Sequence, residues 1–220
     1  MSTNKYSLVL ASQSPRRKEL LGWMDIPFEI ISSDIPEESM FDEPEEIAED
    51  LAGLKGRAVF DRLKTKSGFG TEYFPLVVAS DTVVGCEGKI YGKPEDRNDA
   101  REMLKELSGQ THIVATGVYI GCWDVAKKAY RETLFSVISA VTFDNIADDI
   151  LENYLKTDES LDKAGAYGIQ GKGLTFIAEL EGSYSNVVGF PLADFIDELR
   201  IFLGFDKDKK GEWRKLFHGA

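Results

Sequence analysis

Hydrophobic and polar positions along this chain form patterns that predict strands interleaved with helices. Alternation with a period of two is clearest at residues 134–143, as expected for a strand with two different faces. The run Leu-Val-Val-Ala at 76–79 is typical of a buried strand. Strands are predicted at residues 8–11, 28–33, 76–79, 111–122, 130–143, 176–178 and 184–188, with a hairpin from 81 to 91 that turns at Glu87-Gly88.

Helical spacing separates these strands. The longest helix is predicted at residues 44–66, with an apolar stripe of Ile47, Leu51, Leu54 and Ala58 and with Lys55 at its edge. Lys55 either lays its stem over apolar surface or points its ammonium into a cleft. Further helices are predicted to start at Pro15, to run from 96 or 98 to 107 and from 147 to 156, and to start again at Pro191.

Helices that alternate with strands favour an α/β fold. The long neighbouring strands at 111–143 require antiparallel pairing, so the sheet should be mixed. We see no internal repeat and no linker that would divide the chain, and the charged segment from Asp206 onward is expected to be frayed.

The composition narrows the possible functions. The chain has 220 residues and a formal net charge of -12, so non-specific binding to nucleic acid or to an anionic membrane is not expected. No stretch has the layout of a signal peptide or the length of a transmembrane helix, which makes a cytoplasmic location the expectation. Two cysteines and two distant histidines offer neither a disulfide scaffold nor a zinc site.

A cluster of cations after the first strand is unusual in so acidic a chain. Ser12 and Ser14 precede Pro15, Arg16 and Arg17, and this order predicts a helix that starts at Pro15 with Ser14 as its N-cap. Free N–H groups, the helix dipole and two guanidinium groups would together bind a phosphate. The alternative is an ordinary capped helix with two solvated arginines.

Asp81 follows the apolar run at 76–79 after Ser80, where open α/β sheets place ligand-binding groups. Lys93 lies in Gly92-Lys93-Pro94 at the end of the same hairpin, so two strands of equal length would make Asp81 and Lys93 neighbours. An aspartate that only caps the hairpin, or a surface salt bridge, would give the same pattern.

Two further segments carry candidate ligands. Glu37 and Glu38 follow the strand at 28–33, and carboxylates in such a position can hold Mg²⁺ together with phosphate oxygens and water. The glycine-rich residues 162–173 let the backbone approach a ligand closely, and Gln170 within them could read a base edge. A solvated acidic loop and a surface glycine loop are the alternatives.

Six short sequence stretches, taken together and in order, are informative about the family of the chain. They are Ser-Gln-Ser-Pro-Arg-Arg at 12–17, Ser-Asp-Thr-Val-Val at 80–84, Gly-Lys-Pro at 92–94, Leu-Ser-Gly-Gln-Thr-His at 107–112, Asp-Lys-Ala-Gly-Ala-Tyr-Gly-Ile-Gln-Gly at 162–171 and Gly-Ser-Tyr-Ser-Asn-Val-Val-Gly-Phe-Pro-Leu at 182–192. In this order, and over nearly the whole chain, they resemble the Maf family of nucleoside triphosphate pyrophosphatases.

The resemblance implies an elongated mixed β-sheet flanked by helices, of the Maf and ITPase type. A single domain would cover residues 1–204 around a central cleft, with a charged tail at 205–220. The implied activity is hydrolysis of a nucleoside triphosphate between the α and β phosphates with a divalent metal ion, Mg²⁺ or Mn²⁺. A homodimer is the implied assembly.

The resemblance also implies roles for individual residues. Asp81 matches the catalytic base, and we group Lys93 with it as catalytic, while Ser12, Ser14 and Arg17 belong to the phosphate-binding motif. Lys93 and Lys55 match phosphate-binding lysines, and Glu37 matches a metal-site carboxylate. Because an aspartate is a weak base for free water, Asp81 is either a base toward metal-bound water or itself a metal ligand. The positions associated with nucleotide choice are Arg16, Thr82 and Gln170.

The pair Asp81-Thr82 with Gln170 resembles the dTTP and UTP branch of the family. A 7-methyl-GTP pyrophosphatase and a non-catalytic nucleotide-binding regulatory protein remain the alternatives. The chain departs from the family pattern at Gly56, where alanine would be usual, and at Pro36 just before Glu37.

Overall fold

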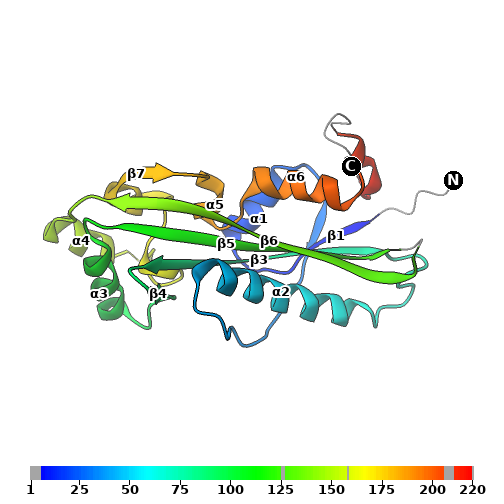
Figure 1. Ribbon diagram of the computed structural model, residues 1–220, viewed down its shortest axis with the longest axis horizontal. Coiled ribbons are helices and arrows are strands. Elements are labelled where there is room, and N and C mark those ends of the chain that lie inside the picture. The colour runs from blue at the N-terminus through cyan, green and yellow to red at the C-terminus, as the bar shows by residue number, and fades with distance from the viewer. Residues whose placement is uncertain (1–5, 125–126, 158, 206–210, 220) are drawn as a thin grey trace.

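The computed structural model describes residues 6–124, 127–157, 159–205 and 211–219. Over these residues the strands form one mixed sheet in the order β2-β1-β3-β5-β6-β7, with β4 paired to β3 (Figure 1). The strands are β1 Ser7–Leu10, β2 Phe28–Ile30, β3 Pro75–Cys86, β4 Lys89–Tyr91, β5 Thr111–Asp124, β6 Ala129–Phe143 and β7 Ile177–Glu181. The predicted α/β fold with an elongated, mixed sheet is confirmed.

Two kinds of pairing meet at β3. On one edge, β3 pairs in parallel with β1 and then, after a gap, antiparallel with β4. On the other edge, it pairs antiparallel with β5 over ten residues, and β5 pairs with β6 along its whole length. The long β5–β6 hairpin sets the elongated shape, as the sequence alternation at 134–143 predicts (Figure 1).

Helices cover both faces of the sheet. The long helix α2 lies along one face, and α1, α5 and α6 lie on the opposite face, while α3 and α4 lie near β4 at one end (Figure 1). The helices are α1 Pro15–Gly22, α2 Pro44–Leu63, α3 Arg97–Leu107, α4 Asp148–Leu155, α5 Tyr184–Val188 and α6 Leu192–Phe202, with short 3₁₀ segments at Ala164–Ala166, Gly171–Phe176 and Glu212–Leu216.

Two glycines let α2 approach the sheet very closely. A Cβ atom at Gly117 of β5 would lie 2.1 Å from the carbonyl oxygen of Ala48, and one at Gly56 of α2 would lie 2.0 Å from the ring of Tyr119. The Tyr119 ring therefore occupies the space that an alanine at position 56 would need. This close packing brings the middle of α2, where Lys55 lies, against the centre of β3.

The predicted stripe of α2 is confirmed only at Leu51, which is buried. The buried side also contains Ala48, Ala52, Val59 and Phe60, whereas the predicted Leu54 and Ala58 are only partly buried. The small residues of this side sit where the helix touches the sheet, so side-chain size is a poor guide to burial here. Lys55 belongs to the buried side and is 7% exposed.

The segment at 184–188, predicted as a strand, is helix α5. Ser183 caps it by accepting a hydrogen bond from the N–H of Asn186, and Gly189 ends it with a left-handed φ of 114°. The apolar pair Val187-Val188 suggested a strand, but these capping residues favour one turn of helix.

The charged tail is not frayed over residues 211–219. Trp213 and Phe217 are buried in the core that contains α1 and α6, and Tyr6 and Phe217 form an isolated parallel bridge. Residues 206–210, which the prediction also covered, lie outside the described residues. No helix in the described part of the chain is long and apolar enough to cross a membrane.

Candidate functional site

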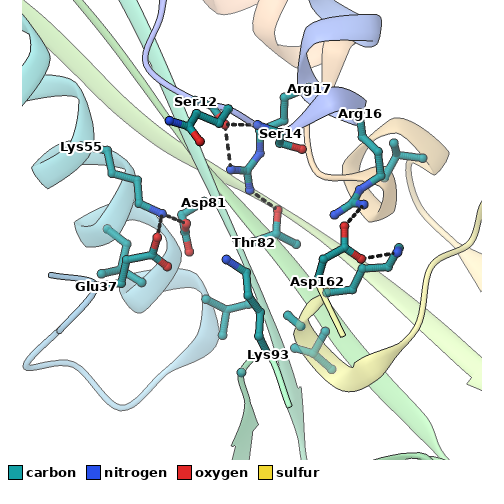
Figure 2. A pocket seen from close by; sticks show the side chains of 18 of the residues that line it. Ser12, Ser14, Arg16, Arg17, Glu37, Lys55, Asp81, Thr82, Lys93 and Asp162 are labelled. Atoms are coloured by element: carbon teal, nitrogen blue, oxygen red, sulfur yellow. Dashed lines mark hydrogen bonds and ion pairs between the residues drawn. The ribbon is translucent and has the colours of Figure 1, made fainter. Parts of the chain in front are cut away.

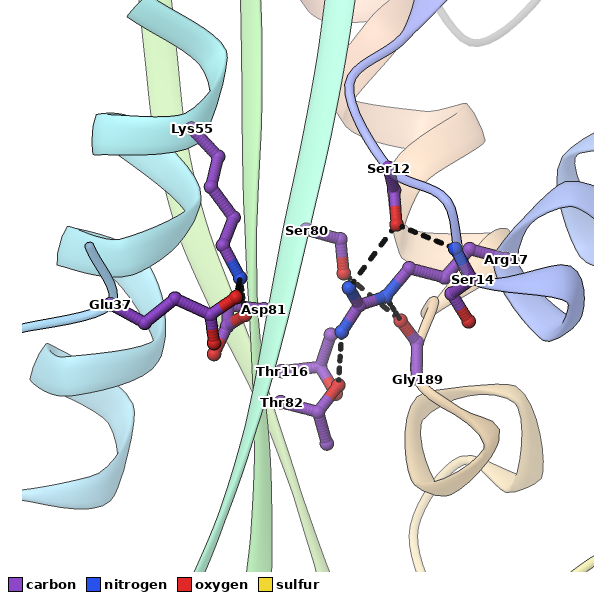
Figure 3. A network of polar contacts seen from close by, with 10 residues as sticks. All are labelled: Ser12, Ser14, Arg17, Glu37, Lys55, Ser80, Asp81, Thr82, Thr116 and Gly189. Carbon is purple, nitrogen blue, oxygen red and sulfur yellow. Dashed lines mark hydrogen bonds and ion pairs between the residues drawn. The ribbon is translucent and has the colours of Figure 1, made fainter. Parts of the chain in front are cut away.

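A cavity of about 740 Å³ opens at the gap in the pairing of β3. The pairing with β1 ends at Val78, and the pairing with β4 begins at Val84, so within the described part of the chain residues 79–83 pair with no strand on that edge. Successive strand residues point to opposite faces. The cavity therefore receives Asp81 from the α2 face and Thr82 from the α1 face (Figures 2 and 3).

An ionic cluster occupies the α2 face. The ammonium of Lys55 forms ion pairs with Asp81 and with Glu37, the latter at 2.9 Å (Figure 2). Asp81 and Lys55 are each 7% exposed, whereas the Glu37 side chain is about half exposed. Burial alone would raise the pKa of Glu37, but the hydrogen bond and charge of Lys55, with Lys93 and Arg17, hold it below its ordinary value. Glu37 and Asp81, two carboxylates for which the family resemblance implies roles, thus both bind the Lys55 ammonium.

A network of neutral acceptors surrounds Arg17 on the α1 face. Its guanidinium donates to the carbonyl of Gly189 at 2.9 Å, to the hydroxyl of Thr82 at 3.1 Å and to Ser12 at 3.5 Å (Figure 3). Ser80 donates to the same Gly189 carbonyl at 2.9 Å. Arg17 is therefore not a freely solvated arginine, because it ties the start of α1 to β3 and to the end of α5.

The predicted start of α1 is confirmed, with Ser14 at the N-cap and Pro15 as the first helical residue. The Ser14 side chain makes no capping hydrogen bond, however. Its backbone N–H instead donates to the hydroxyl of Ser12 at 3.2 Å. Both serines line the cavity, so the loop before α1 forms part of its wall.

Arg16 reaches across the mouth of the cavity. It forms an ion pair of 2.9 Å with Asp162, which also pairs with Lys163 at 2.5 Å (Figure 2). Burial would raise the pKa of Asp162, but the hydrogen bonds and charges of Lys163 and Arg16 hold it below its ordinary value. This contact joins α1 to the glycine-rich segment that carries Gln170, and Gln170 itself lines the cavity.

Asp81 and Lys93, which were predicted to be neighbours, both line the cavity. The charge of Lys93 contributes to lowering the pKa of Glu37. Asp81 lies in the middle of β3 rather than after a strand end, and its ion-pair partner is Lys55. Within the described part of the chain Lys93 has no ion pair.

The donor set suits a hard divalent cation. Glu37 and Asp81 approach the same Lys55 ammonium, so their oxygens face one region of the cavity. The described residues contain no group of three or more histidine, cysteine, aspartate and glutamate side chains that could hold a metal. Two carboxylates, completed by phosphate oxygens and water, match the preference of Mg²⁺, whereas the set does not resemble a zinc site.

Sequence reasoning gave no site role to several polar residues around the cavity. Thr116 and Asn186 are fully buried behind Thr82, and Gly189 supplies the carbonyl that binds Arg17 and Ser80. Asp162 was visible as part of a motif, but its contact with Arg16 spans 146 positions in the sequence. The signal in the sequence that could have pointed to such residues is a polar residue inside an apolar strand, such as Thr116 in β5.

Comparison with known proteins extends over most of the chain. The family described as Maf-like protein matches residues 7–202. The chain is 43% identical over 199 residues to a dTTP/UTP pyrophosphatase of Thermococcus kodakarensis, which covers 90% of this chain and 97% of that protein. Over 193 residues it is 44% identical to a dTTP/UTP pyrophosphatase of Carboxydothermus hydrogenoformans, covering 88% and 97%. A Bacillus cereus protein of the same name is 40% identical over 196 residues, covering 89% and 95%.

Proposed function

The chain belongs to the Maf-like protein family, and we propose that it is a nucleoside triphosphate pyrophosphatase that hydrolyses dTTP and UTP. Water attacks the α phosphorus, the bond from that phosphorus to the leaving pyrophosphate breaks, and a nucleoside monophosphate remains. The attacking water must give up a proton, and the leaving group gains negative charge. Catalysis of this step requires positioning and charge neutralisation more than covalent chemistry.

One observation carries this proposal: a single cavity brings together a buried carboxylate and cations from four separate segments. Asp81 comes from β3, Lys55 from α2, Lys93 from beyond β4, and Arg16 and Arg17 from α1. A triphosphate has enough negative charge to interact with all of these cations. A protein of net charge -12 would not retain an anion of this kind without such a local concentration of positive charge.

We assign Asp81 and Lys93 to the reaction itself. The Asp81 carboxylate would accept the proton of the attacking water or hold the metal, and the ammonium of Lys93 would neutralise charge on the phosphates. Lys55, which already binds Asp81 and Glu37, orients both carboxylates and lowers the pKa of Glu37. Ser12, Ser14 and the start of α1 offer donors to the phosphate oxygens.

A divalent cation, Mg²⁺ or Mn²⁺, is the cofactor that this donor set fits. When bound, it would neutralise negative charge on the phosphate oxygens, and Glu37 and Asp81 are the residues that would hold it. Calorimetry of Mn²⁺ binding tests this assignment without turnover. Glu37→Gln should weaken Mn²⁺ binding by about tenfold or more. Glu38 does not line the cavity, so Glu38→Gln should leave Mn²⁺ binding unchanged.

Nucleotide choice is assigned to Thr82, Gln170 and Arg16. Thr82 and Gln170 line the cavity, and Arg16 is held across its mouth by Asp162. We also propose a cytoplasmic homodimer that binds neither nucleic acid nor membranes. Sedimentation and sucrose-gradient fractionation of cell lysates are the corresponding measurements.

A panel of nucleotides with Mg²⁺ or Mn²⁺ and a pyrophosphate readout tests the proposed function. We expect release of pyrophosphate and monophosphate from dTTP and UTP, and little from 7-methyl-GTP. Preference for 7-methyl-GTP would place the chain in the other branch of the family. Tight binding of dTTP without any pyrophosphate would identify a nucleotide-binding regulatory protein instead.

A further inference from the structure

A chain of hydrogen bonds runs from Arg17 through two threonine hydroxyls to the backbone of α5. Arg17 donates to Thr82 Oγ1 at 3.1 Å, Thr82 Oγ1 lies 3.1 Å from Thr116 Oγ1, and Thr116 Oγ1 lies 3.0 Å from the carbonyl oxygen of Asn186. Figure 3 shows the first three of these side chains beside the cavity. The chemistry of its two ends determines the direction of every bond in the chain.

A carbonyl oxygen only accepts hydrogen bonds, and a guanidinium only donates them. Thr116 must therefore donate its single hydroxyl proton to Asn186. The contact between the two threonines can then form only if Thr82 donates to Thr116. Thr82 accepts from Arg17 and has no proton left, so the one further hydrogen bond its oxygen can make toward a substrate is as an acceptor.

Ser12, on the same side of the cavity, has the opposite character. Its hydroxyl accepts from the N–H of Ser14 at 3.2 Å and from Arg17 at 3.5 Å, so its own proton stays available. Phosphate oxygens accept hydrogen bonds, and Ser12 can donate to them, whereas Thr82 would repel them. The cavity thus offers a donor for the triphosphate at Ser12 and an acceptor for another part of the nucleotide at Thr82.

Thr116 is well fixed for this role. It is fully buried, so it cannot touch a substrate, and it lies directly opposite Thr82 in the register of β3 and β5. Its acceptor is equally fixed, because the buried Asn186 side chain donates to Val114 at 3.0 Å and to Ser139 at 2.9 Å. The Asn186 carbonyl also accepts from the N–H of Gly189 at 2.8 Å, so it remains paired without Thr116.

Given the proposed pyrophosphatase function, we propose that Thr116 is a positioning residue that fixes Thr82 as an acceptor for a donor group on the nucleoside. Two donors are shared by dTTP and UTP: the imide N3–H of the base and the 3′-hydroxyl of the sugar. Either one meets the acceptor at Thr82. A bound nucleotide displaces water from the remaining lone pair of Thr82, and a nucleotide that lacks the donor leaves this lone pair unpaired, so it is bound less well.

Two nucleotide analogues identify the donor. In 3-methyl-UTP a methyl group replaces the imide proton, and 2′,3′-dideoxythymidine triphosphate lacks the 3′-hydroxyl. We expect kcat/KM to fall by about tenfold or more for one of them relative to UTP or dTTP, and the affected analogue names the group that Thr82 binds. Equal kcat/KM for both analogues and their parents would overturn the proposal.

Thr116→Val tests the positioning role, since valine has the shape of threonine but no hydroxyl. Thr82 then loses the contact that fixes its hydroxyl and can turn its lone pair away from the nucleoside, so the discrimination against the affected analogue should shrink by about tenfold. Thr116→Ser restores the hydroxyl and should restore the discrimination. Thr111→Val, at an exposed threonine of the same strand, is the matched control and should behave as the wild type.

An unchanged discrimination ratio in folded Thr116→Val would overturn the proposal. Should this variant fail to fold, Thr82→Val removes the acceptor at the cavity and must abolish the discrimination. Calorimetry gives the ratio of dissociation constants for analogue and parent nucleotide, which does not depend on turnover. Discrimination in binding without pyrophosphate release would contradict the proposed function alone, whereas pyrophosphate release without discrimination would contradict this inference alone.

Discussion

The two faces of β3 present the cavity with two different kinds of chemistry. On the α2 face, Lys55 balances two carboxylates, Asp81 and Glu37, through charge. On the α1 face, Arg17 is surrounded by neutral oxygens, and directed hydrogen bonds fix Thr82. Ion pairs depend on charge and little on direction, so a bound cation or phosphate can act on the same groups, whereas the direction of every hydrogen bond in a chain depends on each of its members.

This difference suits the two faces to different parts of the proposed reaction. The ionic face is suited to chemistry on the phosphates, and the hydrogen-bonded face is suited to recognition of the nucleoside. Adjacent strand residues, Asp81 and Thr82, serve the two faces because the side chains of a strand alternate and β3 has no neighbour on one edge at that point. Substitutions on the ionic face should therefore reduce turnover, and those on the other face should alter selectivity.

The largest effect is expected for Asp81→Asn. The amide keeps the shape but has no negative charge, so it accepts no proton and holds a cation more weakly, and kcat for dTTP should fall by about 10²- to 10⁴-fold while nucleotide binding is largely retained. Steady-state kinetics and calorimetry measure the two quantities. Asp61→Asn, at an exposed aspartate of α2, is the control. Near-normal turnover in Asp81→Asn would remove Asp81 from the mechanism.

Lys55→Met should reduce kcat by about 10²-fold, because two carboxylates then face each other without a cation. Lys55 is the main cause of the lowered pKa of Glu37, so that pKa should rise. A lowered pKa keeps the carboxylate charged until the pH falls through it, and the acid limb of the kcat/KM profile should therefore move to higher pH in the variant. Lys64→Met, at the exposed end of α2, should leave the profile in place.

Gln170→Ala tests the recognition side with an intermediate effect. Removing an amide that both donates and accepts should change the ratio of kcat/KM for UTP over CTP by about tenfold, with smaller changes in kcat. Gln110→Ala provides a control at an exposed glutamine outside the cavity. An unchanged ratio would count against a base-reading role for Gln170.

The ionic face could be predicted from the sequence better than the hydrogen-bonded face. Asp81, Lys93 and Lys55 are charged residues beside apolar stretches, and such residues need a reason to be there. The contacts of Thr82 with Thr116 and of Arg17 with Gly189 join segments 34 and 172 positions apart. Neutral polar residues are common in strands and turns, so no local pattern indicates these pairings.

Errors in the predicted elements have related causes. The predicted stripe of α2 included Leu54 and Ala58, which are only partly buried, whereas Ala48, Ala52 and Gly56 face the sheet, because Gly117 and Gly56 permit a close approach. Helix α5 was predicted as a strand, because two valines outweighed the capping by Ser183 and Gly189. In both cases, contacts between elements or capping residues determine the structure more strongly than the local propensity of the residues.

The smallest effect at neutral pH is expected at His112, which lies four residues before Thr116 in β5. His112 is 1% exposed, its Nε2 lies 2.7 Å from the hydroxyl of Tyr167 in the cavity wall, and its Nδ1 has no hydrogen-bond partner among the described residues. Burial lowers its pKa to about 4. In an unfolded chain the pKa would be about 6.5.

Between these two pKa values, the unfolded chain binds a proton that the folded chain does not, so the free energy of unfolding falls as the pH decreases. For His112 the loss between pH 7 and pH 5 is about 2 kcal/mol. His112→Gln cannot take up this proton, and its amide can still pair with Tyr167. Urea unfolding at the two pH values should therefore show a pH dependence smaller by that amount than in the wild type, with activity at pH 7 little changed. His218→Gln, at an exposed histidine, should keep the full dependence, and parallel curves for the wild type and His112→Gln would show that the buried imidazole is not the group responsible.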